Sequence, residues 1–347
     1  MAAGEPILYS LYVYAPNKGA PIFFTIAFAI SAIFHIWQCY RYKAFKLIGL
    51  HPVCAVLFTV GYALREYGAL DNYLYSTTTK TPLIIFIVSQ IFIYICPPLL
   101  ELANYHVLAR VFYYVPYCSP LPPGRVLAIF GGSMVAVELL NSLGVSFAAN
   151  PASSPEQQTL GSHLTIAAVA LQLAIILIFF ILAGLFHRRL SKASIHAQPV
   201  KAMLTTLYTS MALIFARCVY RLVEHAGNTK VELTSLAALR SLSPLLRHEA
   251  FFYVFEASLM LLNSALWNVW HPGRFLPHDN LTYLARDGSG EVRREETPDG
   301  RTLAAKVGNV VTLGALFRRK ELPEGFLELD RYSERGESRR GVLEGGA

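Results

Sequence analysis

The stretch GSHLTIAAVALQLAIILIFFILAGLF, residues 161–186, decides the fold. It carries no Lys, Arg, Asp or Glu, and it exceeds the roughly 20 residues that a helix needs to cross a hydrocarbon core about 30 Å thick. Inside a bilayer every backbone amide must find its partner within the protein, which a helix achieves by itself. The stretch therefore predicts a transmembrane helix.

Apolar segments of similar length lie on both sides of it, in a chain that is 54% hydrophobic and 15% charged. This composition does not fit a soluble domain. Together the segments predict an all-α polytopic membrane protein with a bundle of seven transmembrane helices. The predicted spans are residues 21–39, 48–68, 82–106, 126–148, 161–186, 203–225 and 249–270.

Basic residues in the connections predict the orientation, because Lys and Arg concentrate in short cytoplasmic loops. The second connection carries only Lys80 and the fourth carries none, whereas the sixth departs from the pattern with Lys230, Arg240 and Arg247. The rule predicts an N-terminus outside and a C-terminus in the cytoplasm. The basic residues of the first, third and fifth connections are Arg41, Lys43, Lys46, Arg110, Arg125, Arg188, Arg189, Lys192 and Lys201.

The residues after the last span have a different composition. They hold 13 basic and 13 acidic side chains with little apolar periodicity, so residues 274–347 are predicted to be a charged, largely disordered cytoplasmic tail behind a membrane domain of residues 1–273. An apolar patch at 307–317 before three basic residues predicts either an amphipathic helix on anionic lipid or a solvated linker. The net charge of +7 belongs to the membrane portion, so no nucleic-acid partner is expected.

Ionisable and amide side chains inside the predicted spans are the candidate functional residues. A charge at the bilayer centre costs about 2.5–3.5 kcal/mol on insertion scales, so such residues face the bundle interior or a wet cavity. Helical spacing places Arg217, Arg221 and Glu224 on one face, and Glu249, Glu256 and Asn263 on another. The full set is Arg65, Glu66, Glu101, Asn104, His106, Glu138, Asn141, Arg217, Arg221, Glu224, Glu249, Glu256 and Asn263.

Two interpretations of this set stay open. In the first, Arg65, Glu66 and the other charges form a structural ion-pair network or gate that joins spans two, six and seven without a ligand. In the second, they line a polar cavity that receives the head group of an amphipathic lipid. Pro97 and Pro98 should kink the third span, which makes them a candidate hinge beside that cavity. Both interpretations can hold together.

Motifs for metal or nucleotide chemistry are missing from the sequence. No two membrane histidines have i, i+4 spacing, and the chain has no HExxH, GxSxG or GxxxxGK[ST]. We therefore expect no metal site, no cofactor and no enzymatic activity.

Six short segments resemble the fungal RTA-like family of seven-span proteins, often described as lipid-translocating exporters. The resemblance implies seven spans, an outside N-terminus, a plasma-membrane location and export of amphiphiles such as sphingoid bases, with resistance to toxic amphiphiles. The segments are YAPN (14–17), GYALR (61–65), CPPLLELANYHVLAR (96–110), ARCVYRLVEHAGN (216–228), HEAFFYVFEASLM (248–260) and HPG (271–273).

The resemblance also implies site residues. Span seven has Glu256 where the family usually has aspartate, and span four has Met134, Val137 and Asn141 where a family pattern of Asp, Ser and Gln precedes a glycine, with Glu138 as a replacement carboxylate. The family's polar signature maps onto Arg65, Glu101, Tyr105, Arg217, Arg221, Glu224, Glu249 and Glu256. The divergence of span four leaves open another ligand than that of the relatives.

The leading functional prediction is a lipid translocase whose partner is a membrane lipid or amphiphile with an amine-bearing head group. One alternative is a seven-span lipid or stress sensor whose tail recruits a cytoplasmic partner. A third is an intramembrane hydrolase that uses a metal-bound water.

Overall fold

The structure, a computed structural model, describes residues 5–71, 73–76, 78–149, 154–193, 198–227, 231–277, 279, 281–285 and 290–293. Most of the predicted tail, including the apolar patch at 307–317, lies outside these residues. Within them, seven helical stretches are long and apolar enough to cross a membrane, which confirms the predicted all-α seven-span fold.

The spans are long helices joined by short elements. They are α1 (Ala20–Tyr42), α3 (Leu50–Asp71), α4 (Thr81–Tyr114), α5 (Pro123–Ala149), α6 (Pro155–Lys192), α7 (Gln198–Ala226), and a seventh span made of α10 (Glu249–Phe252), the π-helix η2 (Tyr253–Ser258) and α11 (Leu259–Val269). The connecting elements are α2 (Phe45–Ile48), η1 (Pro116–Cys118), α8 (Leu236–Ser241), α9 (Pro244–Arg247) and η3 (Pro272–Arg274), followed by the strands β1 (Thr282–Leu284) and β2 (Glu291–Arg293).

Proline and capping residues begin several of these helices. Pro21 and Pro82 lie in the first turns of α1 and α4, where a missing backbone N–H costs nothing. Ser154 begins α6 with a capping box, because its hydroxyl accepts from the Gln157 amide while the Gln157 side chain accepts from the Ser154 amide. The longest span therefore starts at a position that local chemistry defines.

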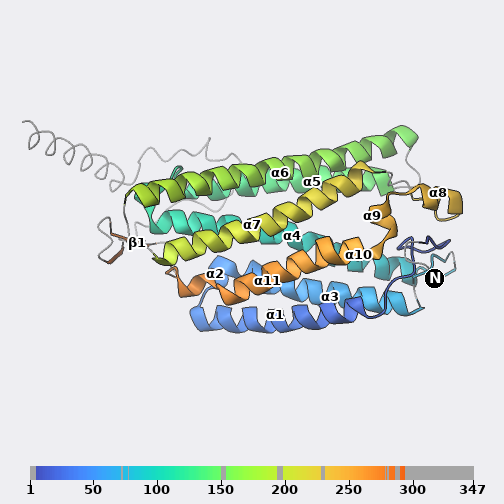
Figure 1. The fold of residues 1–347 in the computed structure, drawn as a ribbon, viewed down its shortest axis with the longest axis horizontal. Helices are drawn as coiled ribbons and strands as arrows, with labels where there is room; N and C mark the ends of the chain where they lie inside the picture. Colours follow the sequence, from blue (N-terminus) through green and yellow to red (C-terminus); the bar gives the residue numbers. More distant parts are fainter. Residues whose placement is uncertain are drawn as a thin grey trace, which may run out of the picture.

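The long helices run side by side (Figure 1), and their contacts close into a ring. Each long helix packs on its neighbours in the order α1, α3, α4, α5, α6, α7 and α11, and α11 packs back on α1. α4 also contacts α7, which brings the proline-containing span across the middle of the bundle. This central position explains why α4 lines the crevice, the groove and the basic cavity described below.

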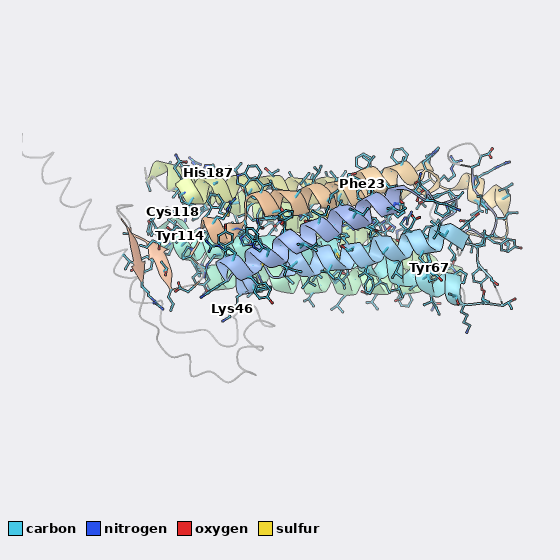
Figure 2. The ribbon with its side chains drawn as sticks, turned by 90° about the horizontal axis from the view of Figure 1, so that it is seen from below. Phe23, Lys46, Tyr67, Tyr114, Cys118 and His187 are labelled. Atoms are coloured by element: carbon cyan, nitrogen blue, oxygen red, sulfur yellow. The ribbon has the colours of Figure 1, made fainter. Side chains whose placement is uncertain are left out.

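The outward surfaces of the helices are apolar and the ends carry aromatic and basic side chains. Ile33, Leu139 and Ile181 are about two-thirds exposed in the absence of a bilayer. Figure 2 shows Phe23 and Tyr67 toward one end of the bundle and Lys46 and Tyr114 toward the other. This pattern is typical of a bundle whose sides face lipid.

The N-terminal segment covers one end of the bundle. Ser10 forms an isolated antiparallel bridge with Leu74, and the amide of Tyr9 donates to the carbonyl oxygen of Leu233 at 3.0 Å. The segment after span seven lies at the opposite end, where β1 pairs antiparallel with β2 (Figure 1). The described N-terminal segment and the segment after span seven thus lie at opposite ends of the bundle, as an odd number of spans requires.

Candidate functional site

A narrow polar crevice lies among α4, α5, α6 and α7, in the half of the bundle nearer the N-terminal segment. Its volume is about 50 Å³, enough for a few water molecules or a chemical group of that size. Four of the predicted substrate-binding residues line it, namely Glu138, Asn141, Arg217 and Arg221. The other lining residues are Tyr94, Pro98, Val137, Ala168, Val169, Gln172 and His225.

The two arginines of the crevice are already paired with carboxylates. The Arg217 Nε donates to the Glu256 Oε1 at 2.6 Å, with both side chains buried. Arg221 pairs with Glu224 one turn further along α7, and its guanidinium lies 4.5 Å from the centre of the Tyr94 ring. Their positive charge is thus largely balanced within the protein.

Glu138 differs from the other acidic residues of the crevice. It is half-buried on α5, and no hydrogen bond or ion pair joins it to another described residue. A carboxylate that lines a crevice without a partner can pair with a cation from outside. The crevice therefore presents a carboxylate that is available to a positively charged group.

Glu101 stands behind the crevice. It is fully buried on α4 and accepts hydrogen bonds from the Tyr105 hydroxyl and from the Gln172 Nε2, the latter at 2.6 Å. Because Gln172 also lines the crevice, it connects this buried carboxyl group to the cavity wall.

An apolar groove adjoins the crevice on the lipid-facing side of α4 and α5. Its volume is about 330 Å³, and it shares Pro98 and Glu138 with the crevice. Val135 and Leu139 line the groove and are each 60% exposed, so it opens sideways toward the bilayer. A polar crevice that shares two wall residues with a lateral apolar groove suits a molecule that has a head group and a hydrocarbon chain.

The π-helix in span seven positions Glu256. A π-helical turn inserts one extra residue and is frequent at functional positions. Here residues 253–258 carry Glu256 into the bundle interior beside Arg217, while its Oε2 finds no hydrogen-bond partner among the described residues. The sequence spacing of seven does not reveal this turn.

A second ionic site lies closer to the end of the bundle. The Arg65 Nη2 donates to the Glu249 Oε1 at 2.9 Å and to the Tyr14 hydroxyl at 3.0 Å, and the guanidinium lies against the rings of Phe252 and Tyr12. Burial raises the pKa of Tyr14, and the positive charge of Arg65 partly offsets that effect. This site ties α3, α10 and the N-terminal segment together and lines neither the crevice nor the groove.

The structure therefore divides the predicted site residues into groups. Glu138, Asn141, Arg217 and Arg221 line the crevice, and Glu101, Tyr105, Glu224 and Glu256 support it from behind. Arg65 and Glu249 form the separate pair, and Glu66 makes no ion pair with any described residue. Pro98 lines the crevice next to Pro97, which is buried in α4.

Sequence reasoning missed Tyr94, Gln172 and His225 as lining residues. Gln172 could have been identified from sequence, because it is the one amide side chain in the apolar stretch 161–186. No sequence feature distinguishes Tyr94, since aromatic residues are common in spans for packing alone.

Histidines gather elsewhere in the bundle. His35 and His51 have ring centres 5.5 Å apart between α1 and α3, and His271 is buried after span seven. In the part of the chain that the structure describes, no three His, Cys, Asp or Glu side chains are grouped so that they could hold a metal ion.

The comparisons with known proteins all indicate the same family. The family model described as RTA1 like protein matches residues 52–279. The lipid-translocating exporter-like protein RTA1 of Leptosphaeria maculans is 59% identical over 316 residues, which cover 90% of this chain and 60% of that protein. This chain thus spans about 60% of the length of that relative.

More distant relatives cover a similar region. The probable lipid transporter atnI of Emericella nidulans is 26% identical over 77% of this chain and 68% of its own length, and the protein RTA1 of Saccharomyces cerevisiae is 24% identical over 76% and 85%. No solved structure matches the chain. Since the family model covers more than half of the sequence, this chain belongs to the RTA1-like family.

Proposed function

We propose that this protein moves amphiphilic lipids across the membrane and that it favours those with an amine-bearing head group, such as sphingoid bases. The observation that carries the proposal is that Pro98 and Glu138 line both the polar crevice and the apolar groove. A single amphiphile can place its head in the first and its chain in the second. The relatives named as a lipid-translocating exporter and a probable lipid transporter support transport of lipid rather than its hydrolysis.

Glu138 is the residue that selects the head group in this proposal. Arg217 and Arg221 have carboxylate partners, whereas Glu138 has none among the described residues. An ammonium group entering from the groove would form a charge-assisted hydrogen bond with Glu138, with Asn141 as a neutral neighbour. A neutral N-acylated analogue would lose that interaction.

Translocation needs two access states, and α4 supplies a hinge. Pro97 and Pro98 cannot donate to the carbonyl groups one turn earlier, so the helix is weakest where the crevice and the groove meet. Bending at this point would change the access of the crevice from one side of the bilayer to the other.

The orientation and location are part of the same proposal. The N-terminal face lies outside and the segment after span seven lies in the cytoplasm, in agreement with the loop charges, and the membrane is the plasma membrane. Export at this membrane would confer resistance to toxic amphiphiles.

The test is transbilayer movement of a fluorescent sphingoid base in liposomes that contain the purified protein. Wild-type protein should move the free amine faster than empty liposomes do, and faster than it moves the N-acetylated analogue. The Glu138→Gln variant should lower the rate for the free amine about tenfold and abolish the preference, since a charge-assisted hydrogen bond is worth about 1.5–3 kcal/mol.

The matched control is Glu232→Gln, which neutralises an exposed loop carboxylate away from the crevice. It should transport as the wild type does. The proposal is wrong if folded Glu138→Gln protein moves the free amine at the wild-type rate and keeps its preference for it.

A further inference from the structure

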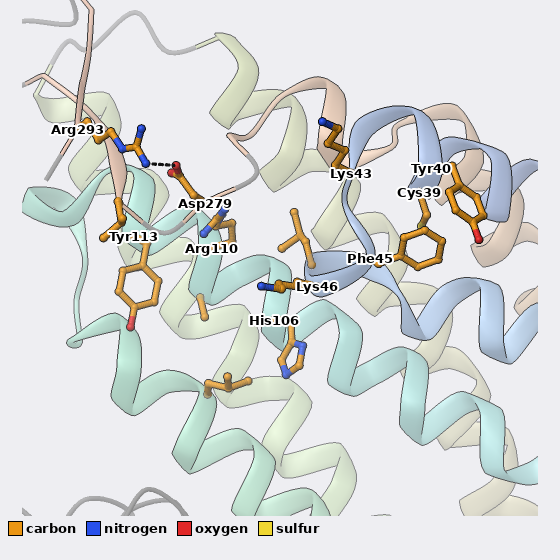
Figure 3. Close-up of a pocket in the computed structure, with 14 residues that line it drawn as sticks. Cys39, Tyr40, Lys43, Phe45, Lys46, His106, Arg110, Tyr113, Asp279 and Arg293 are labelled. Carbon is orange, nitrogen blue, oxygen red and sulfur yellow. Dashed lines mark ion pairs between the residues drawn. The ribbon is translucent and has the colours of Figure 1, made fainter. Parts of the chain in front are cut away.

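A large cavity with a basic lining lies at the end of the bundle opposite the N-terminal segment. Figure 3 shows the residues that line it. Its volume is about 1010 Å³, and its walls come from α1, α2, α4, α5 and the segment after span seven. It shares no lining residue with the crevice or the groove, so what it binds does not depend on the function proposed above.

Positive charge dominates the lining. Four cationic side chains face the cavity, Lys43, Lys46, Arg110 and Arg293, against the single carboxylate of Asp279. That carboxylate already lies 3.9 Å from Arg293, on the post-span segment. Figure 3 shows Lys46, His106 and Arg110 grouped between α2 and α4. The excess of positive charge in the lining thus favours binding of an anion.

Arg110 is the most telling of the four cations. It is only 5% exposed, and its Nε and Nη2 both donate to the carbonyl oxygen of Pro277, at 3.1 and 2.7 Å. It forms no ion pair with any described carboxylate, and a buried charge without a counter-ion is costly. Its Nη1 makes no hydrogen bond to a described residue, so an anionic ligand has a donor to meet.

The cavity is also amphipathic. Phe45 and Leu127, which are 44% and 37% exposed, line it beside the lysines. Both lie at the ends of helices, where a span meets the interfacial region of the bilayer. An acyl chain can therefore contact one wall while the head group meets the cations.

We propose that this cavity binds a phosphorylated lipid head group, with Lys43, Lys46 and Arg110 on the phosphate oxygens and the acyl chains against Phe45 and Leu127. A phosphate monoester carries more than one negative charge and three acceptor oxygens, whereas a carboxylate carries a single charge on two oxygens. Arginine and lysine are the side chains that recognise phosphate. The volume corresponds to the upper part of the range for small-molecule sites.

Because Arg110 also holds Pro277, the ligand would touch the junction between the membrane domain and the post-span segment. Tyr117 strengthens that junction by donating to the carbonyl oxygen of Ala285 at 3.0 Å. The site thus lies where occupancy would stabilise the packing of Pro277 and β1 on α4.

The experiment measures binding of a fluorescent short-chain phosphatidylinositol bisphosphate to the purified full chain in neutral detergent, by fluorescence polarisation. Wild-type protein should bind the probe saturably. The Lys43→Gln/Lys46→Gln variant should bind at least about tenfold more weakly, because each basic residue near anionic lipid contributes about a factor of five. Arg110 is left unchanged because of its structural contact with Pro277.

The matched control is Lys192→Gln/Lys201→Gln, which removes two exposed lysines from the same end of the bundle. It should bind the probe as the wild type does. Equal loss in both double variants, or no saturable binding by wild-type protein, would overturn the proposal. Glu138→Gln should bind normally, which separates this result from the transport experiment.

A competition arm identifies the source of the phosphate. Excess soluble inositol trisphosphate should displace the lipid probe poorly, since it lacks the acyl chains that contact Phe45 and Leu127. Displacement at the same concentration as the unlabelled lipid would overturn the lipid assignment in favour of a soluble organic phosphate.

Discussion

Arg217 and Glu256 form an ion pair that stabilises the fold, whereas Glu138 in the same crevice is proposed to bind the ligand. The two side chains are buried and 2.6 Å apart, so each neutralises the other deep within the bundle. Glu138, on the same crevice, has no such partner among the described residues. Neutralising one carboxylate or the other should therefore have different consequences.

We predict that Glu256→Gln destabilises the fold by about 3–5 kcal/mol, because it leaves the buried Arg217 without a counter-ion. Glu138→Gln should change stability by about 0.5 kcal/mol or less. Unfolding in a titration with sodium dodecyl sulfate measures both. The Arg217→Met/Glu256→Leu variant should recover much of the loss, since replacing a whole buried pair is often neutral. A Glu256→Gln protein as stable as the wild type would show that the pair is not structural.

Asp279 gives a prediction for pH. Its carboxylate accepts from the Thr282 hydroxyl at 2.7 Å and from the Thr282 amide at 3.0 Å, and these bonds, with the nearby Arg293, hold the pKa of Asp279 below its ordinary value. A lowered folded pKa means that this stabilisation is present above about pH 4 and is lost as the pH falls through the folded pKa.

Pepsin cleavage of residues 276–285 should report that loss. The Thr282→Val variant lacks the hydroxyl donor, so near pH 4 it should be cleaved faster than the wild type. The ratio of the two rates should approach one as the pH falls and the wild-type carboxylate becomes protonated. A ratio that stays constant over this range would exclude Asp279 as the titrating group, and taking the ratio removes the pH dependence of pepsin itself.

Among the described elements, α5 and α6 make the most extensive helix contact, and Gly144 permits their close approach. A Cβ at this position would lie 2.7 Å from the backbone nitrogen of Thr165 and 2.8 Å from the carbonyl oxygen of Gly161. Neither atom can move without shifting α6. Small residues at helix interfaces allow backbones in membranes to approach in this way.

We predict that Gly144→Ala destabilises the fold by about 1–3 kcal/mol through overpacking. Gly131→Ala on the same helix is the control, because no atom lies within 4 Å of its added Cβ. It should be neutral or stabilising by up to about 1 kcal/mol. The same detergent titration measures both, and equal stabilities of the two variants would contradict the close approach seen here.

At the scale of the whole molecule, the sequence predicted the number of spans because each is a long apolar run. It also predicted the ionisable residues of the interior, since charges stand out against such runs. It did not predict which partners they choose. That Glu249 meets Arg65 while Glu256 meets Arg217 depends on the π-helix and on the ring order of the helices, neither of which leaves a local pattern.

The basic cavity also escaped prediction from sequence. Lys43, Lys46 and Arg110 are interpreted from sequence only as markers of a cytoplasmic face. They come together because α2 packs against α4, and Asp279, Leu281 and Arg293 line the same cavity. Such a site needs tertiary structure to become visible. Because residues after span seven line this cavity, part of the chain beyond that span belongs with the membrane domain.

Two truncations test that boundary and separate a transporter from a sensor. Deletion of residues 294–347 retains Pro277 on Arg110 and the pairing of β1 with β2, so thermal stability and lipid movement in liposomes should both stay at the wild-type level. Deletion of 275–347 removes the acceptor from the buried Arg110, and it should cost about 1–3 kcal/mol. If the protein is a transporter, cells that carry the variant lacking residues 294–347 should remain protected from toxic amphiphiles. Loss of protection by folded protein that moves no lipid in liposomes would instead favour a sensor that signals through its tail.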